Sequence, residues 1–216
     1  MTASAEASPR RSAERREQLL DAADRAILRD GTHVSMAAIA AEAGITKPIL
    51  YRHFGDKGGL YRALAERHTE ELLISVRDAL LTHDSPRTRT VAAIDAYLAL
   101  IEEQPQVYRF LVGRASAEEP AVAGQVAFFQ QRLAEELAAV IQVDLELPPE
   151  QALRAQVWAH GVVGLVRAAG EWWLEDKPMT RGELVGELVE LLFGALASYE
   201  VTPSQRARGG LPVDRG

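Results

Sequence analysis

The chain has 216 residues, 47% of them hydrophobic and 25% charged, with a formal net charge of −7. These values suit one large or two smaller globular domains and exclude collagen-like and wholly disordered chains. The absence of cysteine excludes disulfides, thiolate zinc sites and iron–sulfur clusters, and no apolar run nears the roughly 18 residues that cross a bilayer. The Arg-rich start is not followed by the apolar core of a signal peptide, so we expect a cytoplasmic protein without membrane contact.

Apolar residues recur with a period of 3.6 along almost every segment, and no stretch alternates as a strand would, which predicts an all-α fold of about nine helices. The first helix is expected from near Ser12 to Asp30, with one apolar stripe formed by Leu19, Ala23, Ala26 and Ile27. Ser35 is a natural N-cap for a short second helix, and Thr46 for a third that ends near Phe54. A long helix follows over 57–81. Later helices are expected to open at Pro86, Pro105, Pro120, Pro148, Pro149 and Pro178.

This organisation predicts a helix-turn-helix DNA-binding domain over 12–56 and an effector-binding and dimerisation domain over 57–202. Residues 1–11 and 203–216 are polar and are predicted to be mobile tails. The charge is divided unevenly, because residues 1–68 carry 11 Lys and Arg against 9 Asp and Glu, whereas residues 69–216 carry 13 against 22. Such asymmetry indicates that the two parts meet different partners.

The two short helices joined by Ala43-Gly44-Ile45-Thr46 have the pattern of a helix-turn-helix, whose second helix enters the major groove of DNA. Apolar residues spaced to bury between the helices are Ile39, Ile45, Leu50 and Phe54. On the outer surface, Lys47 and Arg52 can bond guanine, and Pro48 and Ile49 can contact thymine methyl groups. Phosphate contacts are expected from Tyr51, His53 and Lys57. The same shape also occurs as plain helix packing, so shape alone leaves a structural role open.

Residues 38–60, Ala-Ile-Ala-Ala-Glu-Ala-Gly-Ile-Thr-Lys-Pro-Ile-Leu-Tyr-Arg-His-Phe-Gly-Asp-Lys-Gly-Gly-Leu, resemble the DNA-binding signature of TetR-type regulators. Members of that family are homodimeric, all-helical repressors with a three-helix DNA module and a ligand-binding body. The resemblance spans about fifty residues, from the first helix to the start of the fourth. It implies that double-stranded DNA, a second copy of the chain and a small effector are the partners.

Family roles carry over where the residues match. The resemblance implies that Thr46 caps the recognition helix, that Tyr51, His53 and Lys57 hold the DNA backbone, and that Lys47, Ile49 and Arg52 occupy base-reading positions. Ser35 belongs to the same candidate DNA-binding set. Ala37 stands where some members have a polar base-reading side chain, so the second helix is expected to read less sequence. Arg10 and Arg11 are either a minor-groove arm or part of a solvated tail.

The last helix is apolar around most of its circumference, which fits a core helix as well as a subunit interface. Small residues at 161, 164 and 168 form a flat strip on the preceding helix, where another helix can approach closely. Because TetR-type proteins pair their last two helices into a four-helix bundle, residues 150–176 and 180–199 are expected at the dimer interface. The candidate interface residues are Gly161, Gly164, Ala168, Leu184, Leu188, Leu191, Leu192 and Leu196. A two-fold dimer would meet a pseudo-palindromic operator and leave it when a ligand changes the spacing of its recognition helices.

An effector pocket is expected between the fourth and eighth helices. Its candidate lining residues, each of which could instead be ordinary core, are Tyr97, Tyr108, Phe110, Leu111, Phe128, Phe129, Trp158, His160 and Trp172. Together they suit a hydrophobic ligand. The stretch 170–198 resembles lipid-responsive actinobacterial members of the family, which makes a fatty acyl-CoA one candidate effector; no other cofactor is expected.

Enzyme chemistry finds little support in the sequence. No histidine follows a glutamate at the spacing of a carboxylate-bridged di-iron site, and the five histidines stand singly, so neither a catalytic nor a metal site is expected. Phosphate-binding glycine loops and the Gly-x-Ser-x-Gly motif are absent as well. The remaining alternative to a regulator is an all-helical dimeric ligand-binding or interaction module with a structural helix-turn-helix.

Overall fold

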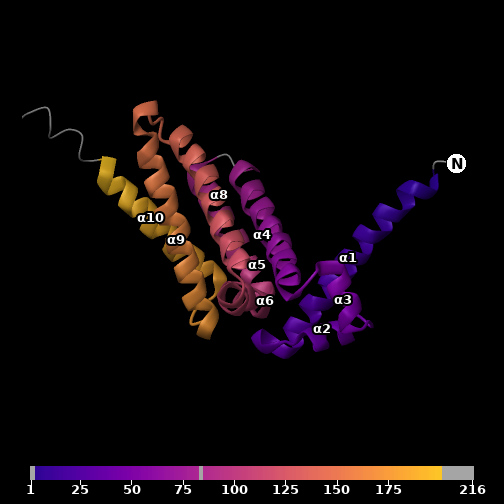
Figure 1. The fold of residues 1–216 in the computed structure, drawn as a ribbon. Coiled ribbons are helices and arrows are strands. Elements are labelled where there is room, and N and C mark those ends of the chain that lie inside the picture. The colour runs from indigo at the N-terminus through magenta and orange to yellow at the C-terminus, as the bar shows by residue number, and fades with distance from the viewer. Residues whose placement is uncertain (1–2, 83–84, 201–216) are drawn as a thin grey trace, which may run out of the picture.

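The computed structural model describes residues 3–82 and 85–200, and within these ranges the chain contains helices and no strand (Figure 1). The predicted all-α fold is confirmed. In chain order the α-helices are α1 (Ala3–Asp30), α2 (Met36–Glu42), α3 (Lys47–Phe54), α4 (Lys57–Thr82), α5 (Pro86–Glu103), α6 (Pro105–Arg109), α7 (Ser116–Glu118), α8 (Pro120–Asp144), α9 (Ala152–Asp176) and α10 (Arg181–Glu200). The shorter segments are the 3₁₀ turns η1 (Gly31–His33) and η3 (Pro149–Gln151) and the π-helical segment η2 (Phe110–Ala115).

The molecule has two parts, which we call the head (α1–α3 and the start of α4) and the body (the rest of α4 through α10). In Figure 1 the head lies at the lower right, the long helices of the body stand side by side, and α6 runs between the two parts. Residues 3–11, for which the sequence predicts a mobile tail, continue α1. The predicted tail over 203–216 lies outside the described residues. No helix in the described ranges is long and apolar enough to cross a membrane.

Local sequence signals begin and end the helices as expected at several positions. The Ser35 hydroxyl accepts a hydrogen bond from the Ala38 amide at 3.1 Å and caps α2. Ser85 and Thr88 form a capping box at the start of α5, where Pro86 occupies the first turn. Gly44 has a φ of +64°, which a residue with a side chain adopts only with strain, and this conformation turns the chain from α2 into α3.

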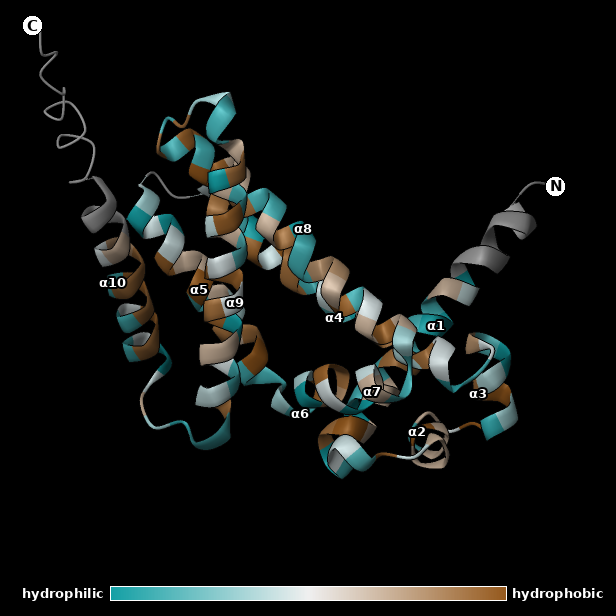
Figure 2. Ribbon diagram, turned by 60° about the vertical axis from the view of Figure 1, so that its left-hand side comes forward, coloured by the Kyte–Doolittle hydropathy of each residue, from teal (hydrophilic) through white to brown (hydrophobic). Residues whose placement is uncertain are grey.

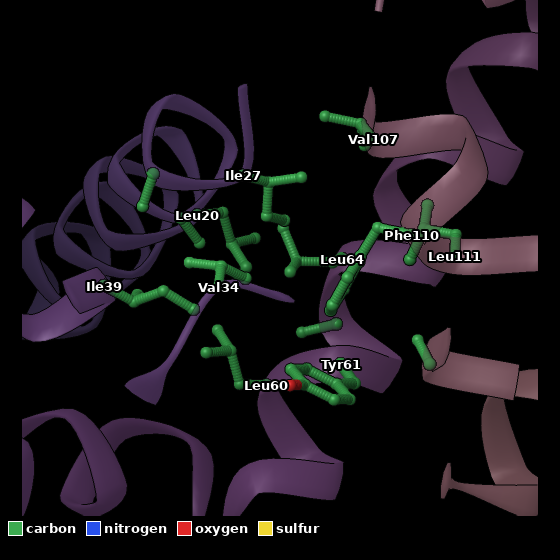
Figure 3. Close-up of a cluster of buried hydrophobic side chains, with 14 of the residues drawn as sticks. Leu20, Ile27, Val34, Ile39, Leu60, Tyr61, Leu64, Val107, Phe110 and Leu111 are labelled. Atoms are coloured by element: carbon green, nitrogen blue, oxygen red, sulfur yellow. The ribbon is translucent and has the colours of Figure 1, made fainter. Parts of the chain in front are cut away.

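The core of the head crosses the boundary that the sequence predicts at residue 56. Figure 3 shows Leu20, Ile27 and Ile39 of the head beside Leu60 and Tyr61 of α4. Side chains from α6 and η2 complete the same cluster, namely Val107, Phe110, Leu111 and Ala115. The aromatic rings of Tyr61 and Phe110 meet edge to face, with 4.8 Å between their centroids. The head is therefore packed directly onto the body.

Candidate nucleic-acid interface and ligand cavity

The recognition helix α3 is fixed by its apolar face. Leu50 is fully buried, and Ile45 and Phe54 pack partly buried against the head core. At its C-terminal end α3 nearly touches α4, because a Cβ atom on Gly59 would lie 1.9 Å from the carbonyl oxygen of Phe54. The Asp56 carboxylate accepts a hydrogen bond from the Gly59 amide at 2.7 Å and begins α4 there. These contacts set the direction in which α3 presents its outer face.

The predicted DNA-reading residues lie together on that outer face. Thr46, Lys47, Pro48 and Arg52 are exposed, as is Ala37 on α2. Half-buried members of the same set are Ile49, Tyr51 and His53. The Lys47 ammonium lies 5.5 Å from the centroid of the Tyr51 ring. The face thus combines two cations, hydrogen-bond donors and small apolar surfaces, which is the chemistry that base edges and phosphates require.

The structure corrects the expected cap at Thr46. Thr46 occupies the N-cap position of α3, but its side chain makes no capping hydrogen bond. A cap accepts from the second or third amide of the helix. The second residue is Pro48, which has no N–H, and the Ile49 amide donates to the Thr46 carbonyl at 3.0 Å instead. The hydroxyl is therefore not used to begin the helix.

Lys57, which is expected to hold a DNA phosphate, is engaged within the chain. Its ammonium forms an ion pair with the Glu118 carboxylate of α7. Glu118 also accepts a hydrogen bond from Arg114 Nε at 2.9 Å, and these two cations lower the pKa of its carboxyl group, Arg114 more than Lys57. Through Nη1, Arg114 donates to the carbonyl oxygens of Thr32 and Val34 in the head. To meet a phosphate, Lys57 would have to exchange partners.

A polar contact joins the head to the body beside the cavity described next. Nε2 of His68 on α4 lies 2.9 Å from Oδ1 of Asp24 on α1, and both side chains are buried. Arg67 also pairs with Asp24, and its Nη1 donates to Asp21 at 2.7 Å. The spacing along either helix alone does not indicate this contact, because the partners are 44 residues apart.

The body contains a cavity of about 540 Å³ between α4, α5, α8 and α9, with contributions from α6, η2 and α10. Five of the predicted lining residues border it, namely Tyr97, Tyr108, Leu111, Phe129 and Trp158. The prediction is wrong for Phe110, which is buried in the head core against Tyr61. It is also wrong for Phe128, His160 and Trp172, which lie on exposed faces of α8 and α9. Helical periodicity does not say which of two neighbouring positions turns inward.

Polar groups occur at a few points of this largely apolar cavity. The Tyr97 and Tyr108 hydroxyls lie 3.2 Å apart, and the Tyr108 hydroxyl donates to the Glu171 carboxylate at 3.1 Å. Burial raises the pKa of Tyr97 to about 12 and also raises the pKa of Tyr108, so both phenols are neutral. Sequence reasoning missed other polar residues that border the cavity, including His68, Arg89, Gln104 and Asp144. In the sequence these charged and amide side chains cannot be distinguished from those of a solvated helix surface.

The predicted interface residues of α9 and α10 lie in two different environments. Gly161, Gly164, Ala168 and Leu191 are exposed. Leu184 and Leu188 pack instead in the core of the same chain, with 4% and 5% of their surface exposed. Leu192 is half-buried beside the cavity, and the side chain of Leu196 lies outside the described residues. The expected interface is thus corrected at Leu184 and Leu188, because α10 uses its first apolar stripe to cover its own body.

A second apolar stripe on α9 faces solvent. Its large members are Leu153, Val157 and Trp172, which are 73%, 69% and 53% exposed, and they follow the same side of the helix as Gly161, Gly164 and Ala168. The opposite side of α9 is buried in the body. In Figure 2 hydrophobic segments run along both α9 and α10. An exposed apolar stripe of this length is typical of a protein–protein contact.

Comparisons with known proteins agree with this geometry. The chain matches the model described as bacterial regulatory proteins, tetR family, over residues 19–64, and the one described as tetracyclin repressor-like, C-terminal domain, over residues 75–208. It is 35% identical over 193 residues to the HTH-type transcriptional activator FasR of Mycolicibacterium smegmatis, covering 88% of this chain and 87% of that protein. An HTH-type transcriptional regulator of Mycobacterium tuberculosis is 34% identical over 184 residues, or 85% of this chain and 77% of that one. A solved TetR-like regulator from Rhodococcus sp. RHA1 has a TM-score of 0.66 at 27% identity and covers 85% of this chain and 96% of its own.

Proposed function

Because the chain belongs to the TetR family of bacterial transcriptional regulators, we propose that it binds a pseudo-palindromic operator as a homodimer and that a small hydrophobic ligand releases it. The observation that carries the DNA part of the proposal is the outer face of α3. Lys47, Arg52 and Pro48 are exposed there, and no acidic side chain lies within α3. A face of this kind supplies the donors and apolar contacts of direct base readout.

The dimer part of the proposal is supported by α9. A helix that buries one apolar face in its own body and exposes another to solvent needs a partner. The small residues Gly161, Gly164 and Ala168 allow a close helix approach, and Leu153 and Val157 extend the apolar surface beyond them. A two-fold axis through this stripe gives the pair of recognition helices that a palindromic site requires.

The release mechanism is supported by one short segment that touches both parts of the molecule. Tyr108 and Leu111 border the cavity, whereas Phe110 packs on Tyr61 at the base of the head. Arg114 then binds two head carbonyls. Since these groups lie within seven residues, a ligand that displaces one displaces the others. Coupling of this type is commonly about 1–3 kcal/mol, or roughly 5–150-fold in DNA affinity.

A second candidate is an activator, which is favoured by the 35% identity to FasR, a transcriptional activator. In that case the ligand acts through the same cavity and the same segment, but the protein stimulates transcription when it is bound to DNA. The two candidates share every contact with DNA. They differ in the change of transcription when the regulator is deleted, which rises for a repressor and falls for an activator.

Selection from random DNA duplexes tests the proposal. A homodimeric regulator should enrich a palindrome whose half-sites are about one helical turn apart, or a multiple of it. Tyr51→Ala should weaken binding to every sequence, whereas Arg52→Ala should relax the preference at one base position in each half-site. If no sequence is enriched, sequence-specific DNA binding is excluded and the structural helix-turn-helix stands.

The effector is proposed to be hydrophobic, with a long-chain acyl-CoA as one candidate, because the cavity is largely apolar and of about 540 Å³. Cavities of this size accommodate molecules of a drug's or a lipid's dimensions. Thermal-shift measurements with acyl-CoAs and with planar aromatic cations distinguish these two classes of effector, since a ligand that binds the folded protein raises the melting temperature of the protein.

A further inference from the structure

The cavity in the body is open along one side. Most residues that border it are buried or half-buried, but Val157 and Gly161 of α9 and Ala195 of α10 border it and are exposed as well. The two helices do not seal this side together, because α9 packs mainly on α8 and α10 mainly on α5. The cavity therefore has a mouth, which we define as the opening between Val157 and Gly161 on α9 and Ala195 on α10.

The mouth lies on a side of α9 that carries almost no charge. From Leu153 to Trp172 the exposed residues of α9 include no Asp, Glu, Lys or Arg, and His160 is their one titratable side chain. This stripe is about 28 Å long, as the rise of an α-helix implies. In a chain of which 25% is charged, a solvent-facing stripe of this length indicates a surface that another protein covers.

A second copy of the chain fits this stripe. In a two-fold contact one residue meets a second residue of the partner while that second residue meets the first, so a stripe can cover its own counterpart. The middle of the stripe falls between Gly161 and Gly164, where the absence of side chains lets two helices approach closely. The large apolar residues stand at its two ends, Leu153 at one and Trp172 at the other. Each end can therefore pack against the opposite end of the partner's stripe.

The stripe alone is too small to hold two copies together. A helix with its side chains is about 10 Å wide, so the stripe offers roughly 300 Å², whereas a stable interface buries about 800 Å² on each partner. The contact must therefore extend from α9 onto a neighbouring helix. Leu191 of α10 is 57% exposed, and Gly194 and Ala195 are exposed beside it on the far side of the mouth. An interface that includes both α9 and α10 spans the mouth between them.

On the basis of the homodimer in the proposed function, we propose that the partner subunit closes the mouth and completes the ligand cavity. The partner's α9 then covers Val157 and Gly161, and a molecule in the cavity is enclosed by both copies of the chain. Entry through the mouth requires the dimer to open. Because the site is complete only in the dimer, ligand binding and association of the two copies strengthen each other by the same free energy.

The absence of cysteine from the chain provides a test that needs no ligand. The variant Ala93→Cys places one thiol on α5, at a buried position that borders the cavity and lies on neither α9 nor α10. Its rate of reaction with a small methanethiosulfonate reagent is measured with and without Gly164→Glu, which puts a charge in the middle of the stripe and should separate the copies. Gly164 does not itself border the cavity. We expect the thiol to react at least about 10-fold more slowly in the dimer, because the reagent must wait for the mouth to open.

Ile74→Cys is the matched control. Ile74 of α4 is 61% exposed, and α4 packs on α5 and α8 rather than on α9 or α10, so its thiol should react at the same rate in dimer and monomer. If Gly164→Glu does not fold, dilution of Ala93→Cys until light scattering finds monomers gives the same comparison. If Ala93→Cys does not fold, Leu100→Cys replaces it, because Leu100 is a half-buried residue of α5 that also borders the cavity.

Equal rates for the cavity thiol in the dimer and in the folded monomer overturn the proposal and leave the dimer in place. That result is expected if the interface runs from α9 onto α8, where Phe128 is 55% exposed, because the mouth then stays open. A chain that is monomeric at every concentration, or a Gly164→Glu variant that stays dimeric, overturns the proposal as well. DNA selection is scored separately: enrichment of a palindrome without protection of the thiol rejects only the closed mouth, and protection without enrichment rejects only the regulator.

Discussion

Replacing Glu118 by glutamine should strengthen DNA binding, because it releases Lys57 from its partner in the body. In the unbound chain the Lys57 ammonium is paired with the Glu118 carboxylate, and that pair must break before Lys57 can meet a phosphate. Glutamine keeps an oxygen that can accept from Arg114, so the contact of Arg114 with the head carbonyls should survive.

The size of the effect follows from exposure. Both side chains of the pair are 36% exposed, and ion pairs at that level are worth about 0.2–1 kcal/mol. The proposed dimer has two such pairs, so Glu118→Gln should make the free energy of operator binding more favourable by about 0.4–2 kcal/mol, or lower Kd about 2- to 30-fold. Fluorescence anisotropy with the selected operator at fixed salt measures this change.

Removal of any carboxylate near DNA would raise affinity to some extent, so a double-mutant cycle is needed. In the Lys57→Met background Glu118→Gln should lose most of its effect, because no lysine remains to be released. Glu119→Gln removes the neighbouring charge and is the matched control. The affinity ratio should also stay constant between about pH 6 and pH 8, because Arg114 and Lys57 lower the pKa of Glu118 and the pair is lost only as the pH falls through that lowered value. An equal gain with and without Lys57 would refute the release of Lys57 as the cause.

Three further predictions concern stability and assembly. Gly59→Ala should lower the melting temperature by about 2–12 °C, because its Cβ would overlap the Phe54 carbonyl. Gly58→Ala is the control, because its Cβ meets only the flexible end of Glu119. Equal melting temperatures of the two variants in calorimetry would contradict this prediction. Gly164→Glu should convert the proposed dimer to a 23.6 kDa monomer in light scattering, with Gly124→Glu on α8 as a control in equally open space. If both variants stay dimeric, α9 is not in the interface. Gln104→Leu should raise the melting temperature by about 2–4 °C, because it removes a buried acceptor that lacks a partner and costs about 1 kcal/mol. Gln130→Leu in the same cavity should raise it less. A lower melting temperature for Gln104→Leu would show that the Gln104 amide is satisfied.

The helix-turn-helix was predictable because its information is local. The apolar spacing of Leu19 through Ile27, the Ser35 cap and the turn at Gly44 each depend on neighbours within a few residues, and the structure agrees at these positions. The cap at Thr46 failed for a reason that is also local, since Pro48 removes one of the two amides that a cap can use. Pro48 is thus the local signal in the first turn of α3 that argues against a Thr46 side-chain cap.

The interface residues, the cavity lining and the distant ion pairs depend on tertiary contacts. A helix with two apolar faces does not specify which face covers its own body, and for this reason the sequence predicts Leu184 and Leu188 at a subunit interface although they are core. Phe110 and Phe129 have the same chemistry, but one packs in the head core and the other borders the cavity. The partners of Arg89 and Lys57 are 55 and 61 residues away, beyond the reach of any periodic pattern.

The acidic excess of residues 69–216 takes on a more specific meaning from these two distant pairs. A net charge of −9 spread over a solvated surface would only keep the body away from DNA, and that effect is screened within about 8–10 Å. Two of its carboxylates instead form ion pairs with distant cations of the chain, Glu118 with Lys57 below the head and Asp144 with Arg89 beside the cavity. At Lys57 an internal carboxylate thus occupies a cation that a DNA phosphate is proposed to bind. If Lys57 is a phosphate contact as proposed, this pair sets a threshold for DNA binding, and Glu118→Gln should relax it.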